Sequence, residues 1–219
     1  MDSIYDYDEI LNVLKASYES GPSPSVTLIA NTLKTPYNVL VSTIISLRTK
    51  DQVTLAASQR LFERADDVYA LQMLTEEEIG GLIYPAGFYK TKAKNLKKIA
   101  DIVINQYGGN IPDEMDDLLK LPGVGRKTAN LVLILGCNKL GLCVDTHVHT
   151  VSNRLGWVNT KTPDETEFAL RELLPVEHWR LINDYLVSFG QKVCVPVSPF
   201  CSRCGLNEVC HRNGVTKNR

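Results

Sequence analysis

The sequence predicts an all-α fold, and three observations support that prediction. Apolar residues recur at helical spacing along most of the chain, as at Leu11, Leu14 and Tyr18. Capping and helix-breaking residues stand where these periodic stretches begin and end. Strand-like alternation of apolar and polar residues is nowhere sustained. A chain of 219 residues, 44% of them hydrophobic, can bury a core in one domain or in two closely packed lobes.

The N-terminal half begins with an amphipathic helix that ends at the linker SGPSPS. Thr35 and Pro36 form a cap and first-turn pair for a helix that runs to Leu47. Asp51 is predicted to cap the next helix, which ends near Phe62.

Two capping-box patterns predict further helices. Thr75 with Glu78, and Thr162 with Glu165, place a hydroxyl and a carboxylate three residues apart at a helix start. A last amphipathic helix, which contains Tyr185, runs into a cysteine-rich tail.

Composition and charge exclude several classes of protein. The net charge is −1 and the pI about 6.4, so any nucleic-acid surface must be a local patch. No apolar run is long enough to span a bilayer, and the acidic start MDSIYDYDEI differs from a secretory signal. We therefore expect a soluble cytoplasmic protein with no membrane partner.

The stretch LPGVGRKTANLVLILG, residues 121–136, joins two predicted helices through a tight turn. Its glycines, Gly123 and Gly125, can adopt backbone angles closed to other residues and let a partner approach the bare amides. Those amides, with the positive end of the following helix behind them, suit an anion such as a DNA phosphate. The predicted phosphate-binding residues are Gly123, Val124, Gly125 and Arg126.

Lys127 falls in the first turn of that second helix, where the helix dipole and Arg126 disfavour its charged form. An uncharged amine is a nucleophile, so this is a position for a lysine that attacks a substrate. Taken alone, the motif is also compatible with a simple turn and a solvated lysine, because short motifs have a high false-positive rate. Two further motifs favour the catalytic interpretation.

The first of them is VDTHV, residues 144–148, which places Asp145 between an apolar stretch and another helix. An aspartate at this point fits the N-cap of the helix, and a cap is compatible with a catalytic role. His147 is a candidate DNA contact, with a core or surface histidine as the simpler interpretation.

The second is the pattern C-x6-C-x2-C-x5-C near the end of the chain. Without a secretory context thiols stay reduced, so we expect this group to bind a metal. Soft thiolates suit either tetrahedral zinc or an iron–sulfur cluster, but structural zinc sites usually pair two tight knuckles and this tail has one. The predicted metal ligands are Cys194, Cys201, Cys204 and Cys210.

The stretch YPAGFYKTKAKNL, residues 84–96, combines a turn at Gly87, the aromatic Phe88 and a run of lysines that includes Lys92. We expect these lysines on the solvent side of the next helix, and a solvated helix face would explain them. An aromatic beside cations is also what a duplex-probing wedge needs, since stacking holds an opened base step while cations hold the backbone.

The motifs LPGVGRKTA and VDTHV and the cysteine pattern, in this order and spacing, resemble the endonuclease III family of DNA glycosylases with abasic-site lyase activity, within the helix-hairpin-helix superfamily. The resemblance spans nearly the whole chain. It implies a hairpin lobe of residues 27–139, a second lobe of residues 1–26 and 140–219, and a DNA groove between them. It also implies a 4Fe-4S cluster on the four cysteines.

The resemblance also implies the roles of individual residues. Lys127 would attack the sugar, form a Schiff base and cleave the strand by β-elimination. Asp145 would stabilise the cationic sugar or move a proton. Arg48 and Phe88 match the family's wedge positions, although bacterial members often have Gln in place of Arg48.

The lysine also predicts the substrate, because related adenine-mismatch glycosylases have Ser at the position of Lys127 and thymine-mismatch ones have Tyr. We expect a monomeric, prokaryotic, nucleoid-associated enzyme that removes oxidised pyrimidines such as thymine glycol from duplex DNA and incises abasic sites. The alternatives are a non-catalytic DNA-binding module with a structural metal cluster and a mismatch-specific glycosylase of the same superfamily.

Overall fold

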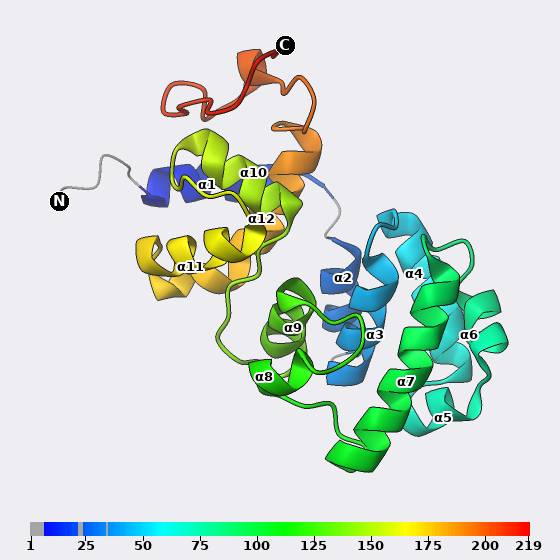
Figure 1. Ribbon diagram of the computed structural model, residues 1–219. Coiled ribbons are helices and arrows are strands. Elements are labelled where there is room, and N and C mark those ends of the chain that lie inside the picture. Colours follow the sequence, from blue (N-terminus) through cyan, green and yellow to red (C-terminus); the bar gives the residue numbers. More distant parts are fainter. Residues whose placement is uncertain (1–6, 22–23, 34) are drawn as a thin grey trace. The chain divides into compact units, whose positions relative to one another are not determined.

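The computed structural model describes residues 7–21, 24–33 and 35–219 (Figure 1). Every regular element within these ranges is a helix or helical turn, so the predicted all-α fold is confirmed. In the same residues, no helix is both long and apolar enough to cross a membrane. The acidic residues before Tyr7 and part of the linker SGPSPS lie outside the described residues.

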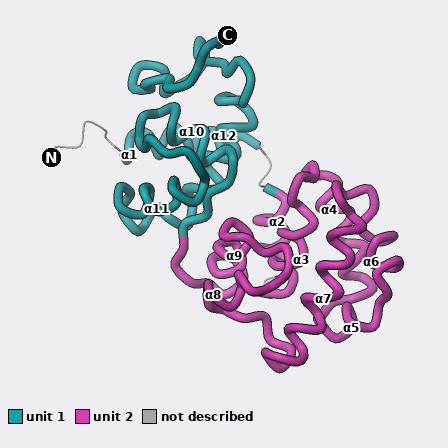
Figure 2. Tube along the Cα trace, viewed as in Figure 1, with its two compact units in different colours: residues 1–24, 142–219 teal, residues 25–141 magenta. Residues whose placement is uncertain are grey.

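The chain divides into two compact units (Figure 2). The hairpin unit comprises Ser25–Gly141, and the terminal unit combines Met1–Pro24 with Leu142–Arg219. The terminal unit therefore joins the two ends of the chain, with the hairpin unit inserted between them in sequence.

The hairpin unit is organised around one buried helix. Its elements are α2 (Ser25–Leu33), α3 (Pro36–Ser46), α4 (Asp51–Arg64), α5 (Val68–Met73), α6 (Glu76–Ile83), α7 (Tyr89–Tyr107), α8 (Met115–Leu118), α9 (Arg126–Leu131) and the π-helical turn η1 (Val132–Gly136). Helix α3 packs against α2, α4, α7, α9 and η1, which explains why most of its residues are buried. Helix α7 also packs against α5 and α6.

Side chains cap the starts of α3 and α6 as the sequence predicts. The Thr35 hydroxyl accepts a hydrogen bond from the Asn38 amide at 3.1 Å at the start of α3. Thr75 and Glu78 form the reciprocal capping box of α6, with distances of 3.1 Å and 2.8 Å. Each bond satisfies an amide that the helix itself leaves unpaired.

The prediction that Asp51 caps α4 is wrong by one position. Lys50 holds the N-cap, and Asp51 is the first residue of the helix. The Asp51 carboxylate instead accepts a hydrogen bond of 2.7 Å from the Ser25 hydroxyl, which ties the start of α4 to the start of α2.

The terminal unit has its own core. Its elements are α1 (Tyr7–Glu19), α10 (Thr146–Leu155), α11 (Pro163–Leu173), the 3-10 turn η2 (Val176–His178), α12 (Trp179–Lys192) and the 3-10 turn η3 (Cys201–Arg203). Helix α12 packs against both α1 and α10, so the first helix of the chain completes a core built from the C-terminal part. Leu14, Val148, Ile182 and Leu186 are fully buried in it.

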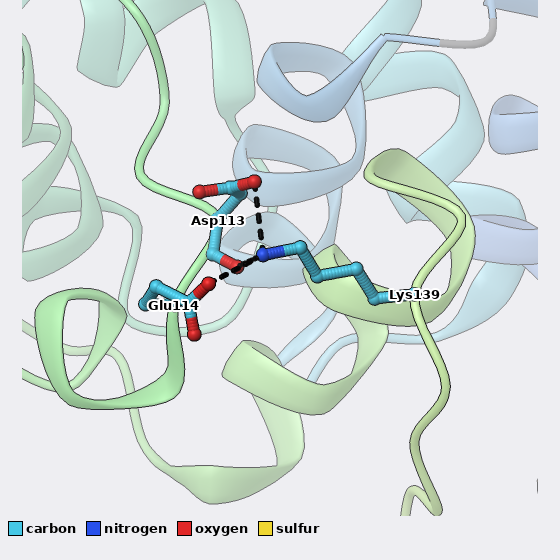
Figure 3. A network of polar contacts seen from close by, with 3 residues as sticks. All are labelled: Asp113, Glu114 and Lys139. Carbon is cyan, nitrogen blue, oxygen red and sulfur yellow. Dashed lines mark hydrogen bonds and ion pairs between the residues drawn. The ribbon is translucent and has the colours of Figure 1, made fainter.

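An ion-pair network joins the two ends of the helix-hairpin-helix segment (Figure 3). Lys139 follows η1, and its ammonium lies 2.9 Å from a carboxylate oxygen of Asp113 and 2.6 Å from one of Glu114. It also donates to the Asp113 carbonyl. Hydrogen bonds from Lys139 to Glu114 and Asp113 raise the pKa of the Lys139 ammonium. Since both acids precede α8, the network connects the chain before the hairpin to the chain after it.

Candidate functional site

The hairpin between α8 and α9 depends on one glycine for its shape. Gly123 has a φ of 78°, in the left-handed region that favours glycine. A Cβ atom at this position would also lie only 2.5 Å from the side-chain nitrogen of Asn95, on α7. The turn is closed by a 3.1 Å hydrogen bond from the Val124 amide to the Leu121 carbonyl.

Gly125 has a different role in the same turn. It is the N-cap residue of α9, with an extended backbone, and a Cβ atom there would meet no neighbour within 4 Å. Gly123 and Gly125 are both exposed, so the backbone of the hairpin is accessible to a ligand. This arrangement suits close approach of a phosphate to the start of a helix.

Lys127 lies in the first turn of α9, as the sequence predicts, and its side chain is half-buried. The residues that follow it, Thr128, Ala129 and Asn130, are buried and fix this end of the helix in the core. The helix continues as the π-helical turn η1, whose Val132 and Ile134 are buried. The predicted buried helix after the hairpin is therefore confirmed, with its second part wound as a π-helix.

Asp145 in the terminal unit is the N-cap of α10, as predicted from its position. One carboxylate oxygen accepts hydrogen bonds from the amides of His147 at 2.8 Å and Val148 at 2.9 Å. The Asp145 side chain is 9% exposed. A carboxylate held by two amides at a helix start is fixed in direction, which suits a group that must face a developing positive charge.

The His147 ring is half-buried and lies against α12. A Cβ atom at Gly190 would be 2.7 Å from the ring nitrogen Nδ1, so the glycine makes room for the imidazole. The expected contact of His147 with DNA stays a prediction.

The structure brings together the two predicted wedge residues, which are far apart in sequence. Arg48 lies in the turn between α3 and α4, and Phe88 immediately precedes α7. The guanidinium carbon of Arg48 is 5.2 Å from the centre of the Phe88 ring, within the range of a cation–π contact. Both side chains are accessible to solvent, Phe88 to 64%. An aromatic ring and a cation therefore project from one place on the hairpin unit.

The expectation that Lys92 lies on the solvent side of α7 is wrong. Its side chain is 5% exposed, and its ammonium donates to the Ile45 carbonyl at 2.7 Å, the Leu47 carbonyl at 2.6 Å and the Thr49 hydroxyl at 2.9 Å. Burial lowers the pKa of Lys92 to about 8. These three bonds occupy the ammonium within the protein, so it is not positioned to contact a phosphate.

A signal for this burial is present in the sequence. Lys92 precedes Leu96 by four residues and Ile99 by seven, which places it on the same face of α7 as these buried side chains. The prediction failed because the neighbouring lysines suggested that every lysine of this run faces solvent.

The four cysteines of the tail line one cavity in the terminal unit, together with apolar residues such as Phe189. None of them is in a disulfide. Burial raises the pKa of the Cys204 thiol, and the nearby Cys210, Cys194 and Cys201 raise it further. The described residues contain no group of three or more His, Cys, Asp or Glu spaced to hold a single metal ion.

Two arginines contribute N–H groups to the sulfur atoms. The buried guanidinium of Arg154 donates to Cys194 Sγ at 3.4 Å and to the carbonyls of Val195 and Pro196 at 2.9 Å and 2.7 Å. The Arg212 amide donates to Cys210 Sγ at 3.4 Å. Soft sulfur donors, N–H groups directed at them and an apolar lining fit a thiolate-ligated metal group. Sequence reasoning missed Arg154, because nothing in its local pattern marks it as a loop anchor.

The all-helical fold, the glycine hairpin with a lysine in the following turn and the capping aspartate define a helix-hairpin-helix protein. The HhH-GPD superfamily base excision DNA repair protein family matches residues 41–176. Endonuclease III of Thermotoga maritima is 49% identical over 175 residues, which cover 80% of this chain and 82% of the relative. Two chloroplastic endonuclease III homologues of Arabidopsis thaliana are 45% identical, and this chain spans 47% and 48% of their length.

Two solved structures match almost the whole chain. A non-covalent endonuclease III–DNA complex has a TM-score of 0.83 and 30% sequence identity, and the match covers 95% of this chain and 97% of that one. A trapped endonuclease III–DNA covalent intermediate has a TM-score of 0.79 and 28% identity, with the same coverage of 95% and 97%. The chain belongs to the endonuclease III family of base excision repair proteins, which are DNA glycosylases and abasic-site lyases.

Proposed function

We propose that this enzyme removes oxidised pyrimidines of the thymine glycol type from duplex DNA and cleaves the abasic site with Lys127 as the nucleophile. The observation that carries the proposal is the position of Lys127, in the first turn of α9 directly behind the exposed hairpin. The fold match to a protein trapped covalently on DNA supports a reaction that passes through a covalent intermediate.

The proposed reaction begins with attack of the uncharged Lys127 amine on C1′ of the damaged nucleotide. The bond between C1′ and the base breaks, and the base leaves with its electron pair. The lysine nitrogen loses a proton, and the C1′–O4′ bond breaks as the ring oxygen takes up a proton. The opened sugar is then joined to Lys127 as a protonated Schiff base, which acidifies the neighbouring C2′ proton. Loss of that proton expels the 3′ phosphate by β-elimination, and water then releases the lysine from the imine.

Asp145 supports this chemistry in the proposal by stabilising the cationic sugar or by moving a proton. Its carboxylate is already oriented by the amides of His147 and Val148, so it needs little reorganisation during the reaction. Lys127 and Asp145 belong to different units, and the groove predicted between the lobes stays a prediction.

Base removal also requires that the nucleotide leave the helical stack, at a cost of a few kcal/mol. We assign Phe88 and Arg48 to the gap that it leaves, because both are accessible to solvent and adjacent. The hairpin residues Gly123, Val124, Gly125 and Arg126 are assigned to the phosphate backbone. The proposal includes a monomeric state and action on the DNA of a prokaryotic nucleoid.

We propose a 4Fe-4S cluster as the group held by Cys194, Cys201, Cys204 and Cys210. The support is the shared cavity, the absence of disulfides among these four cysteines and the N–H donors from Arg154 and Arg212. When bound, such a cluster supplies a cross-link for a loop that has little core of its own. The excision steps are assigned to Lys127 and Asp145.

Borohydride trapping tests the central proposal. The protein is incubated with a duplex that contains one abasic site, and a reduced covalent adduct is expected for the wild type but not for Lys127→Ala. Lys120→Ala is a matched control, because Lys120 is an exposed lysine at the start of the same hairpin, paired with Asp117. It should form the adduct as the wild type does.

Excision assays on duplexes with thymine glycol, with adenine opposite 8-oxoguanine and with a G·T mismatch test the substrate class. Preferential release of thymine glycol is expected. Binding to DNA without an adduct or base release would refute the proposal and favour the non-catalytic module.

A further inference from the structure

The two residues of the wedge lie on turns that share a strained backbone feature. The Arg48 turn is residues 47–50, between α3 and α4, and the Phe88 turn is residues 84–88, between α6 and α7. Arg48 has a φ of 54° and Phe88 a φ of 56°. Neither is glycine, and such backbone conformations persist only where the surroundings enforce them.

A single hydroxyl connects the two turns. Thr49 Oγ1 accepts a hydrogen bond of 3.0 Å from the Gly87 amide and another of 2.9 Å from the Lys92 ammonium. The hydroxyl can donate in return to the Leu47 carbonyl at 3.3 Å. Thr49 therefore links the Arg48 turn directly to the Phe88 turn.

Lys92 completes the connection from the first turn of α7. Its amide donates to the Phe88 carbonyl at 3.0 Å, while its ammonium donates to the Ile45 and Leu47 carbonyls at the end of α3. A positive charge at the C-terminal end of a helix is favourable. Because Lys92 is 5% exposed, water cannot readily replace these bonds when the ammonium is removed.

The backbones of the two turns are also in direct contact. A Cβ atom at Gly87 would lie 2.4 Å from the Arg48 carbonyl oxygen. A small shift of either turn would therefore displace the other.

We infer that Lys92 and Thr49 are positioning residues that hold the Arg48 and Phe88 side chains together as one DNA-opening wedge. The inference rests on the proposed function and deepens it, since it explains how the wedge keeps its shape. Lys92 does not contact DNA itself in this inference. It fixes the backbone of the two turns that carry Arg48 and Phe88, in place of the phosphate contact expected from the lysine run.

The test uses two variants that break the connection and two that preserve it. Lys92→Met keeps the length of the side chain and removes the ammonium, and Thr49→Val keeps the shape and removes the acceptor. Thr49→Ser retains the hydroxyl, so base excision by this variant should match that of the wild type. Lys97→Met is the matched control, because Lys97 is on the same helix and donates to the Gln72 carbonyl, which lies in neither turn.

Three measurements separate positioning from a general structural effect. Single-turnover base excision is followed in a duplex with 2-aminopurine opposite the lesion, whose fluorescence reports unstacking. Cleavage of a pre-formed abasic site in single-stranded DNA needs no wedge and reports the lysine chemistry alone. The salt dependence of duplex binding reports phosphate binding, since the slope of log K against log salt decreases in magnitude by about 1 for each phosphate that the protein no longer neutralises.

For Lys92→Met and Thr49→Val we expect excision and the fluorescence change to fall by about tenfold or more, the effect of leaving buried polar groups unpaired. Single-strand cleavage and the salt slope should stay close to wild type. Thr49→Ser and Lys97→Met should match the wild type in all three measurements.

Several outcomes would overturn the inference. They are wild-type excision by both disrupting variants, an equal loss on single-stranded DNA, an equal loss in Lys97→Met, or a reduced salt slope in Lys92→Met. If Lys92→Met does not fold, the Thr49→Val and Thr49→Ser pair decides. A wild type that neither excises a base nor forms an adduct would instead refute the proposed function.

Discussion

Replacement of Asp145 separates its capping role from its proposed catalytic role. The Asp145→Asn variant keeps a side-chain oxygen for the amides of His147 and Val148, which lie 2.8 Å and 2.9 Å from the carboxylate. Asn and Asp are about equally good N-caps, so this variant loses only the interaction of the carboxylate charge with the helix dipole, which lowers the free energy of unfolding by about 0.3–1 kcal/mol. Asp145→Ala removes the acceptor, leaves the buried Val148 amide unpaired and should cost about 2 kcal/mol.

The activity should follow a different order from the stability. If the Asp145 carboxylate stabilises the cationic sugar or transfers a proton, both variants should lose about 10²- to 10⁴-fold in single-turnover excision of thymine glycol. Urea unfolding followed by circular dichroism gives the stability of each variant, and the excision assay gives the rate. An Asp145→Asn variant that is folded and excises within about tenfold of the wild type, a smaller loss than such groups usually contribute, would show that Asp145 is only a cap.

Three further predictions test the hairpin, the buried lysine and the cysteine tail. Gly123→Ala should lower the free energy of unfolding in urea by about 1–3 kcal/mol, because of the positive φ and the close approach of Asn95. Gly125→Ala should lower it by less than about 1 kcal/mol, because a Cβ atom there meets no neighbour. Equal losses for the two variants would contradict this account. Burial lowers the pKa of Lys92 from 10.5 to about 8, so the folded state releases this proton first as the pH rises. The unfolding free energy of the wild type relative to Lys92→Met should therefore increase between about pH 8 and 10.5 and be level below pH 8, and a decrease over that range would refute the assignment. Cys204→Ser should lower the iron and sulfide content of the purified protein and the stability of the terminal unit, and a wild type that contains zinc without iron would exclude the cluster.

Local sequence features predicted most of the helices and the caps of three of them. The hydroxyls of Thr35 and Thr75 cap α3 and α6, and Asp145 caps α10, because each bond joins groups two or three residues apart. The hairpin followed for the same reason, since the conformation of Gly123 depends mainly on its immediate neighbours. The one-residue error at Asp51 arose because its carboxylate bonds to Ser25, 26 positions earlier in the chain.

The tertiary structure decided what the side chains of the wedge and the cysteine tail contact. Thr49 and Gly87 are 38 residues apart, and Arg154 and Cys194 are 40 apart, so no local pattern reports either pair. Lys92 illustrates the difference most clearly. Its spacing to Leu96 and Ile99 places this residue on the buried face of a helix, but the carbonyls that accept from the ammonium are supplied by the end of α3, far away in sequence. Spacing along a chain defines a helix and its faces, while the environment of a charged group is set by segments that meet only when the chain folds.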